Sequence, residues 1–285
     1  MDYIDLHVHS NASDGTLTPT EVVDLAITSG LRAIALTDHD TLSGLGEARS
    51  AALLHSDADN PLRIIPGTEI SVSYKNKDIH LLGLFVDPDN NELDKALRNA
   101  VKNRDVRNEK MTENLRNAGM DITIEKIRQT EGNAVLTRAH FAKYMTAHGF
   151  TKSNEDAFHR YLHDTSPYYV PREYLSPEEA IALIHKAKGL AILAHPLLYK
   201  YNLKEVEELV ALLCTYGLDG IEAIYSSNMG FDEGHLRRIA NKYGLAISGG
   251  SDFHGANKPH LSIGTGKGNL KIPYTILEQL EERLK

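Results

Sequence analysis

The sequence predicts an α/β fold built around a mostly parallel sheet or barrel. Runs rich in Ile, Val and Leu alternate with helical patterns, which is the order expected when helices connect parallel strands. Several of these runs are apolar throughout, as strands buried on both faces are. With 285 residues, the chain is long enough to bury a large core without cross-links.

Seven segments have the apolar pattern of strands. In chain order they are "YIDLHVH", "LRAIALTDH", "LRIIPGTEISVSY", "DIHLLGLFV", "GLAILAH", "LDGIEAIY" and "GLAISGGSDFH". Two helices begin at clear signals, at residues 18–21 ("TPTE") and 176–179 ("SPEE"). Each signal supplies a capping hydroxyl, a proline at the first helical position and a glutamate that completes a capping box. The pattern ends in a helix, "PYTILEQLEERLK".

The middle of the chain has a different pattern. Between Asn90 and Tyr168 it is polar and helical, and "NELDKALRNAVKNRDVRNEKMTENLRNAGM" places Leu, Ala, Val and Met at helical spacing among charged residues. The strand–helix alternation resumes near Pro171. We therefore expect the first part of a barrel at residues 1–89, an inserted helical subdomain that covers the substrate at 90–168, and the second part of the barrel at 169–285.

Composition limits both location and partners. The single cysteine, Cys214, rules out a disulfide framework and a cysteine-rich zinc site, so a metal centre would have to use His, Asp and Glu. The sequence starts without a signal-peptide pattern and has no apolar stretch long enough to cross a bilayer, which predicts a cytoplasmic protein with no membrane partner. A net charge of −8 argues against binding of duplex DNA.

Histidines and carboxylates recur where the strand-like runs end. His7 and His9 are two residues apart, so on a strand their side chains point to the same face. Because the carboxyl ends of parallel strands meet at one rim, we expect nine side chains to form one cluster: His7, His9, Asp14, His39, Glu69, His80, His195, Asp252 and His254. Nine groups are too many for one tetrahedral ion but suit two or three divalent ions that share a carboxylate. Mixed imidazole and carboxylate ligands favour manganese, iron or zinc over calcium.

Six motifs follow one another in a characteristic order. They are "HVHS" with "SDG", "TDHD", "IPGTEIS", "IHLLG", "AHP" and "SDFH", and together they resemble the PHP family, named for its polymerase and histidinol-phosphatase members. The resemblance covers nearly the whole chain outside the middle segment. It implies a distorted seven-stranded α/β barrel with a trinuclear metal site at the carboxyl ends of the strands. It also implies three sets of ligands: His7, His9, Glu69 and Asp252; Glu69, His80 and His195; and Asp14, His39 and His254.

Within this family, the chain is most similar to the TrpH-like branch, whose members share the helical insertion. That branch includes phosphatases of nucleoside 3′,5′-bisphosphates and exoribonucleases that trim RNA from its 5′ end. Some family members have histidine at the position of Asp14. The aspartate found here fits the nucleotide-phosphatase branch and weakens an assignment as a histidinol phosphatase.

We therefore expect an enzyme that hydrolyses the 3′ phosphate of nucleoside 3′,5′-bisphosphates by in-line attack of a metal-bound hydroxide, with Glu69 bridging two ions. Its partner would be a small phosphorylated nucleotide. The alternatives are a 5′–3′ exonuclease acting on short RNA, a phosphatase of mononucleotides or histidinol phosphate, and a cyclic phosphodiesterase. The alternative that is not an enzyme is a metal-stabilised structural module. The complete set of nine candidate ligands argues against it, because such a module could lack some of them. The sequence leaves the oligomeric state open.

Two aspartates are expected to support the cluster. Asp38 and Asp40 flank His39, and they either hold that ligand in place, assist proton transfer or cap the next helix. These readings remain open at the level of sequence.

Five further residues are candidates for contact with the substrate. The resemblance suggests that Arg138 and His140 clamp a second phosphate, a role that suits the planar guanidinium group. Arg172 and Lys200 are either further substrate contacts or solvated surface charges. Asn228 follows a strand on the same rim, and it either lines the nucleoside pocket or caps a helix.

Overall fold

The computed structural model describes residues 2–57, 61–75 and 77–285. Its strands are β1 (Tyr3–Val8), β2 (Leu31–Leu36), β3 (Arg63–Tyr74), β4 (Lys77–Leu84), β5 (Leu190–Leu193), β6 (Gly220–Tyr225) and β7 (Ala246–Gly250). Its α-helices are α1 (Pro19–Thr28), α2 (Leu45–His55), α3 (Asn91–Asn117), α4 (Ile124–Glu131), α5 (Arg138–Ala147), α6 (Asn154–Ala157), α7 (Pro177–Lys186), α8 (Leu203–Thr215), α9 (Asp232–Tyr243) and α10 (Thr275–Arg283). Three short turns of other helical types are η1 (Phe158–Leu162), η2 (Pro196–Tyr199) and η3 (Gly255–Asn257).

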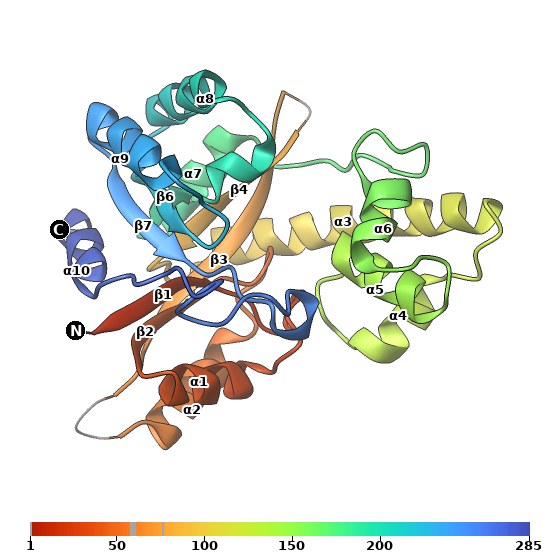
Figure 1. The fold of residues 1–285 in the computed structure, drawn as a ribbon, viewed down its shortest axis with the longest axis horizontal. Helices are drawn as coiled ribbons and strands as arrows, with labels where there is room; N and C mark the ends of the chain where they lie inside the picture. Colours follow the sequence, from red (N-terminus) through yellow and green to blue (C-terminus); the bar gives the residue numbers. More distant parts are fainter. Residues whose placement is uncertain (1, 58–60, 76) are drawn as a thin grey trace.

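The seven strands form one sheet in sequence order, from β1 to β7. Neighbouring strands are parallel except around β4, which is antiparallel to both β3 and β5. The sheet curves until its ends almost meet (Figure 1): a bridge joins Val8 to Phe253, just beyond β7, and the His9 amide donates to the Phe253 carbonyl at 3.0 Å. The predicted seven-stranded α/β barrel is therefore confirmed, but the reversal of β4 is not visible in its apolar pattern.

Apolar side chains fill the barrel and the layers between the sheet and its helices. The inner core includes Leu82 of β4 and Ile224 of β6, and it is joined by Leu277 and Leu280 of α10. The amide of Tyr274, which precedes α10, donates to the carbonyl of Asp2 at 2.9 Å, so this helix covers the end of the barrel where β1 begins. Outside the sheet, α7, α8 and α9 pack on one part and α1 and α2 on another.

The middle segment forms a helical lobe beside the barrel, to the right in Figure 1. Helix α3 connects the two bodies: Leu93 and Leu97 near its start pack in the core beneath α7, whereas Met111 and Leu115 near its end pack in a separate core with α4 and α5. This separate core explains why the helical spacing of residues 90–168 differs from the rest of the chain. The exact limits of this subdomain stay a prediction.

Both predicted capping boxes are present. The Thr18 hydroxyl accepts a hydrogen bond from the Glu21 amide, and the Ser176 hydroxyl accepts one from the Glu179 amide. In each box the glutamate carboxylate accepts the backbone amide of the capping residue. Among the described residues, no helix combines the length and the apolar character needed to span a membrane.

Candidate metal centre

The nine predicted ligands lie together at the end of the barrel opposite α10. They come from β1 and the turn after it (His7, His9, Asp14), the segment after β2 (His39), β3 and β4 (Glu69, His80), and the loops after β5 and β7 (His195, Asp252, His254). Because β4 runs in the opposite direction, its beginning rather than its end reaches this rim. The side chains are buried, apart from a half-buried His80.

Three ligand atoms, from His7, His9 and Glu69, form a compact group, and Asp252 lies beside the two histidines. The Nε2 atoms of His7 and His9 are 3.1 Å apart, and they lie 3.4 and 3.2 Å from Glu69 Oε2. Both nitrogens lie 3.6 Å from Asp252 Oδ1. Ligands at about 2.1 Å from a tetrahedral ion are about 3.4 Å apart, so the separations among His7, His9 and Glu69 suit one shared ion.

The two oxygens of Glu69 face different neighbours. Oε2 belongs to the group just described, whereas Oε1 lies 2.7 Å from His80 Nδ1 and 2.9 Å from His195 Nε2. In addition, His39 Nδ1 is 3.1 Å from Oε2. A carboxylate placed in this way can bridge two cations, as expected for Glu69.

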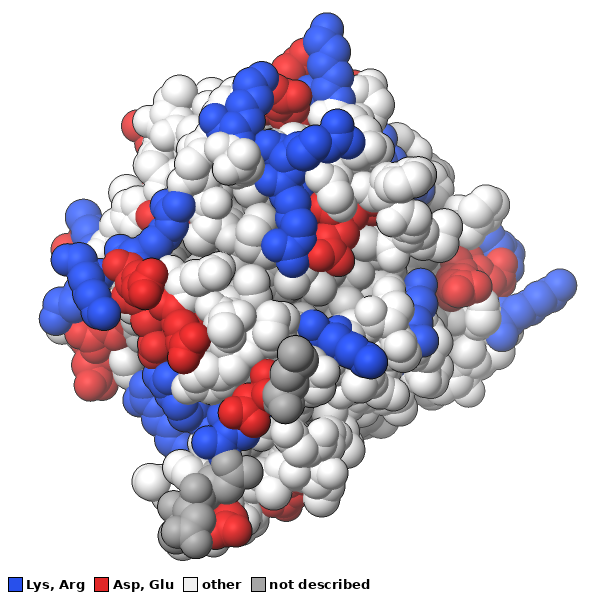
Figure 2. All heavy atoms as spheres, turned by 60° about the vertical axis from the view of Figure 1, so that its left-hand side comes forward, with Lys and Arg blue, Asp and Glu red and all other residues white. Residues whose placement is uncertain are grey.

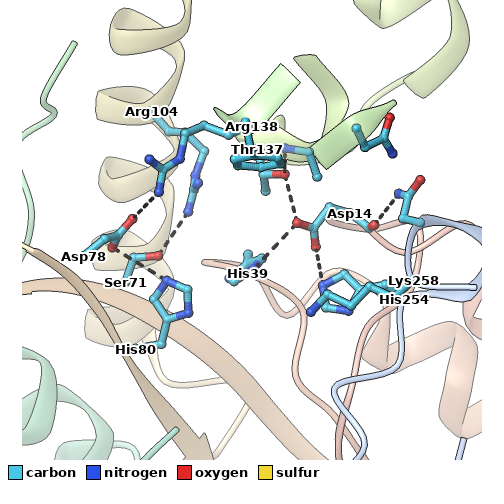
Figure 3. A pocket seen from close by; sticks show the side chains of 14 residues that line it. Asp14, His39, Ser71, Asp78, His80, Arg104, Thr137, Arg138, His254 and Lys258 are labelled. Carbon is cyan, nitrogen blue, oxygen red and sulfur yellow. Dashed lines mark hydrogen bonds and ion pairs between the residues drawn. The ribbon is translucent and has the colours of Figure 1, made fainter. Parts of the chain in front are cut away.

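Asp14 lies at the centre of a third group of candidate ligands, on the other side of His9. Its Oδ1 lies 3.2 Å from His254 Nε2, and its Oδ2 lies 3.7 Å from His39 Nε2. The Thr137 hydroxyl donates to Oδ2 at 2.9 Å, which connects the turn after β1 to the start of α5 (Figure 3). His9, Asp14, His39 and His254 together offer one ligand atom each within 4.8 Å of one another.

Several buried atoms in the cluster have no hydrogen-bond partner among the described residues. They are His39 Nδ1, Glu69 Oε2 and His195 Nδ1. Buried polar atoms are normally paired, so three unpaired atoms in one cluster need an explanation. Lone pairs on imidazole nitrogens and a carboxylate oxygen are ligands for a divalent transition metal, and the donor set therefore fits metal binding.

The carboxylates of the cluster favour positive charge around them. Burial alone would raise the pKa of Glu69, but the surrounding imidazoles, beginning with His39 and His80, hold it well below its usual range. Burial would lower the pKa of His80, but Glu69 and Asp78 raise it to about 10. The site thus attracts a cation, either as a proton on an imidazole or as a metal ion.

The backbone is strained at three positions around the cluster. Asp40, His195 and Asp252 have positive φ angles of 53°, 26° and 57°. This region costs free energy for residues other than glycine and persists only where the surrounding structure enforces it. Since His195 and Asp252 lie two residues after β5 and β7, the strain turns their side chains into the cluster close to the point where each strand ends.

Glu222 of β6 supports the cluster from within the barrel. Its Oε1 lies 3.0 Å from His7 Nδ1, and its Oε2 accepts the backbone amide of His195 at 2.8 Å. Because a carboxylate can only accept, Nδ1 of His7 carries the proton and Nε2 is left free for a ligand bond. Sequence reasoning missed this role of Glu222. The feature of the sequence that could have identified Glu222 is that it is a charged residue inside an apolar strand, on the same face as Ile224.

The two aspartates around His39 serve the local fold. Asp38 accepts from the Ser10 amide at 2.8 Å and from the Ser13 hydroxyl at 2.6 Å, so it fixes the turn between His9 and Asp14. Burial raises the pKa of Asp38 to about 6. The expectation that these aspartates cap the next helix is wrong, because α2 has Gly44 at its cap and no side-chain cap.

Asp40 forms a buried ion-pair network with two arginines. It accepts from Arg104 of α3 and from Arg172 at 3.2 Å. Burial opposes ionisation, but Arg104 and Arg172 lower the pKa of Asp40 to about 2. The reading of Arg172 as a solvated surface charge is therefore wrong: its guanidinium is buried, and it stacks on Tyr174 with 4.4 Å between the central carbon and the ring centroid.

An open cavity of ≈ 250 Å³ lies between the cluster and the helical lobe. Its lining residues are Asp14, His39, Ser71, Asp78, His80, Arg104, Thr137, Arg138, Ala139, Asn154, Phe158, His254, Asn257 and Lys258. Figure 3 shows Arg138 and Thr137 at the start of α5 on one side, with His80 and Ser71 on the other. Arg138 thus lines the cavity, where Asp78 is 3.6 Å away and Asp164 accepts from it.

Three predicted substrate contacts lie elsewhere. The Nδ1 atom of His140 accepts the Thr137 amide at 2.9 Å, which completes the cap of α5, and His140 does not line the cavity. Lys200 is exposed and is also absent from the lining. The Asn228 amide donates to the Ala223 carbonyl at 2.7 Å, and Asn228 does not line the cavity.

The cavity includes two cationic residues that sequence reasoning missed. Arg104 is one of many charged residues on α3, and no pattern distinguishes it from the exposed ones. Lys258 follows the "SDFH" motif and lies 2.6 Å from Asp252 Oδ2. Its closeness in sequence to His254 is the signal that could have identified it.

An α/β barrel with a cluster of imidazoles and carboxylates at its strand ends defines a metal-dependent hydrolase. A model of the PHP domain matches residues 5–221, and the chain belongs to the PHP family. The protein is accordingly a metal-dependent phosphoesterase, as the family and the full-length relatives below indicate.

Relatives extend along the whole chain. A 3′,5′-nucleoside bisphosphate phosphatase from Chromobacterium violaceum is 34% identical over 100% of this chain and 98% of its own length. A 5′-3′ exoribonuclease from Haemophilus influenzae is 35% identical over 88% of this chain and 89% of its own length. Among solved structures, an inferred metal-dependent phosphoesterase from Bifidobacterium adolescentis matches with a TM-score of 0.86 and 30% identity, covering 99% of this chain and 96% of that one.

Proposed function

We propose that the protein removes the 3′ phosphate of nucleoside 3′,5′-bisphosphates. The observation that carries this proposal is that one cavity joins the histidine–carboxylate cluster to the guanidinium group of Arg138. A substrate with one phosphate at the cluster and a second at Arg138 matches this arrangement. The Chromobacterium violaceum relative, which matches over the full chain, supports the same substrate class.

The cluster would hold two or three divalent ions, of manganese, iron or zinc. His7, His9, Glu69 and Asp252 would bind one ion; Glu69, His80 and His195 a second; and Asp14, His39 and His254 a third. When bound, such ions supply an activated water and stabilise negative charge on the phosphoryl oxygens. Three divalent ions bring about six positive charges against three carboxylates, which makes the pocket cationic inside an acidic protein.

The protein's own groups orient the site and the substrate. Glu222 fixes the tautomer of His7, and Thr137 fixes Asp14. Arg138 would bind the 5′ phosphate, because its planar guanidinium presents several N–H donors to phosphate oxygens. His140 would act indirectly, by capping the turn that carries both Thr137 and Arg138.

A 5′–3′ exoribonuclease is the second candidate. It is favoured by the Haemophilus influenzae relative, and the same cluster would serve for cleavage of a diester. A single-stranded RNA chain beyond the first nucleotide needs a basic or aromatic path. Figure 2 shows the face that carries α9 and α10, where basic and acidic side chains are interspersed; the candidate centre lies at the opposite end of the barrel.

Product analysis with matched substrates tests the proposal. Metal-reconstituted protein is given adenosine 3′,5′-bisphosphate, a 5′-phosphorylated oligoribonucleotide, adenosine 3′-monophosphate and histidinol phosphate at equal concentrations. We expect the highest kcat/KM with the bisphosphate, with release of inorganic phosphate and adenosine 5′-monophosphate. Activity on the oligoribonucleotide alone would reject the proposal in favour of the exoribonuclease.

A further inference from the structure

One wall of the cavity carries an aromatic ring that the proposed phosphate chemistry does not use. Phe158 lines the cavity with 36% of its surface exposed, among residues that are otherwise polar apart from Ala139. An exposed phenylalanine on a polar wall does not contribute to the core of the lobe. Its exposed face is available to a flat, apolar ligand.

The segment around Phe158 is firmly held. Phe158 begins η1, a π turn, a type of helical turn frequently found at functional sites. Ala157 and Leu162 on either side are completely buried in the core of the helical lobe. Arg138 donates to the Leu162 carbonyl at 3.2 Å, so the turn that presents the ring is tied to the arginine proposed to bind the 5′ phosphate.

Asn154 lies beside the ring on the same wall. It is four residues before Phe158, and its carbonyl accepts the Phe158 amide, so the two side chains project from the same helical face. Within the described part of the chain, the Asn154 side-chain amide makes no hydrogen bond. An aromatic face and a free amide are the two groups by which proteins bind a nucleobase: one stacks on the ring and the other pairs with its edge.

We infer that Phe158 and Asn154 form a nucleobase subsite. The base of the substrate stacks on Phe158, and the Asn154 amide donates to and accepts from its edge. The inference rests on the proposed function, since the subsite positions a nucleoside whose phosphates lie at Arg138 and at the cluster. Because every base has a stacking face, Phe158 serves all four bases, whereas Asn154 favours adenine, whose N6 and N7 match an amide.

The test compares substrates with and without a base. Phe158→Leu and Phe158→Tyr are assayed on adenosine 3′,5′-bisphosphate and on 1,2-dideoxyribose 3,5-bisphosphate, which lacks the base. Phe158→Leu is expected to lower kcat/KM for the adenosine substrate by about 5-fold or more, mainly through KM, and to leave the base-free substrate unchanged. Phe158→Tyr keeps the ring and is expected to retain activity. Phe231→Leu, at a phenylalanine that is 83% exposed and does not line the cavity, is the matched control.

A binding measurement separates this inference from the proposed reaction. Calorimetry compares adenosine 5′-monophosphate with ribose 5-phosphate on the metal-loaded protein. Tighter binding of the nucleotide, lost in Phe158→Leu and reduced in Asn154→Ala, supports the subsite even if neither bisphosphate is hydrolysed. Equal affinity for the two ligands would overturn the subsite even if the bisphosphate is hydrolysed as proposed. The same fall in kcat/KM for the adenosine substrate and the base-free substrate in Phe158→Leu would also overturn it.

Discussion

The Glu222 carboxylate joins two segments of the candidate metal centre. One oxygen lies 3.0 Å from Nδ1 of His7, and the other accepts the amide of His195 at 2.8 Å. Glu222 therefore sets both the tautomer of one proposed ligand and the backbone position of another. A side chain that contacts no ion itself can in this way control how well the centre binds metal.

Glu222→Gln is expected to weaken metal binding by about 10- to 100-fold, because an amide cannot accept both hydrogen bonds in the same geometry. The measurement is a titration of metal-stripped protein with manganese or zinc. Glu233→Gln changes a partly exposed glutamate of α9 and is the matched control. Unchanged metal affinity in Glu222→Gln would contradict the role given to this residue.

His9→Ala is expected to abolish turnover without unfolding the chain. The Nε2 of His9 belongs to the group with Glu69 and Asp252, and its Nδ1 lies 3.7 Å from Asp14, so the imidazole lies between two proposed ion positions. Its loss should reduce activity by more than the roughly 100-fold that loss of a supporting partner costs. Circular dichroism checks the fold, and His185→Ala, which removes a partly exposed partner of Asp219, is the control. Retained activity in His9→Ala would exclude His9 as a ligand.

Arg138→Lys is expected to raise KM for adenosine 3′,5′-bisphosphate by about 10-fold or more, since it keeps the charge but loses the planar set of donors. KM for adenosine 3′-monophosphate should change little, because that substrate lacks the 5′ phosphate. Steady-state kinetics on both substrates provide the comparison. An equal rise in both KM values would mean that Arg138 acts through its contacts with Asp164 and Leu162 rather than on the phosphate.

Asp40→Asn is expected to destabilise the fold by about 3 to 5 kcal/mol, because it leaves the buried guanidinium groups of Arg104 and Arg172 without a carboxylate. Asparagine tolerates the positive φ angle at this position, so the change tests the ion pairs and not the backbone. Urea denaturation gives the free energy of unfolding. Asp94→Asn removes an exposed pair with Arg98 and should cost at most about 1 kcal/mol. Equal effects of the two substitutions would argue against a role for the buried network.

The predicted ligands could be identified from sequence because each follows a rule of local geometry. His7 and His9 are two residues apart at the end of β1, and His195 and Asp252 each lie two residues after a strand. These local patterns place polar groups at one rim of any parallel α/β barrel. The order of the six motifs along the chain then indicated the PHP family.

The rest of the site depends on tertiary packing that local patterns do not encode. Arg104 faces Asp40 because the start of α3 packs on the barrel, and α3 carries charged residues along its whole length. Phe158 reaches the cavity through a π turn that has no sequence signal of its own. The reversal of β4 likewise depends on its pairing with β3 and β5.

The most direct test of the account is to follow adenosine 3′,5′-bisphosphate by phosphorus NMR with one protein preparation, first stripped of metal and then reloaded with manganese. We expect no reaction in the stripped protein. After reloading, we expect inorganic phosphate and adenosine 5′-monophosphate in equal amounts. Undiminished turnover by the stripped protein, or formation of adenosine 3′-monophosphate by the reloaded protein, would contradict the proposed reaction.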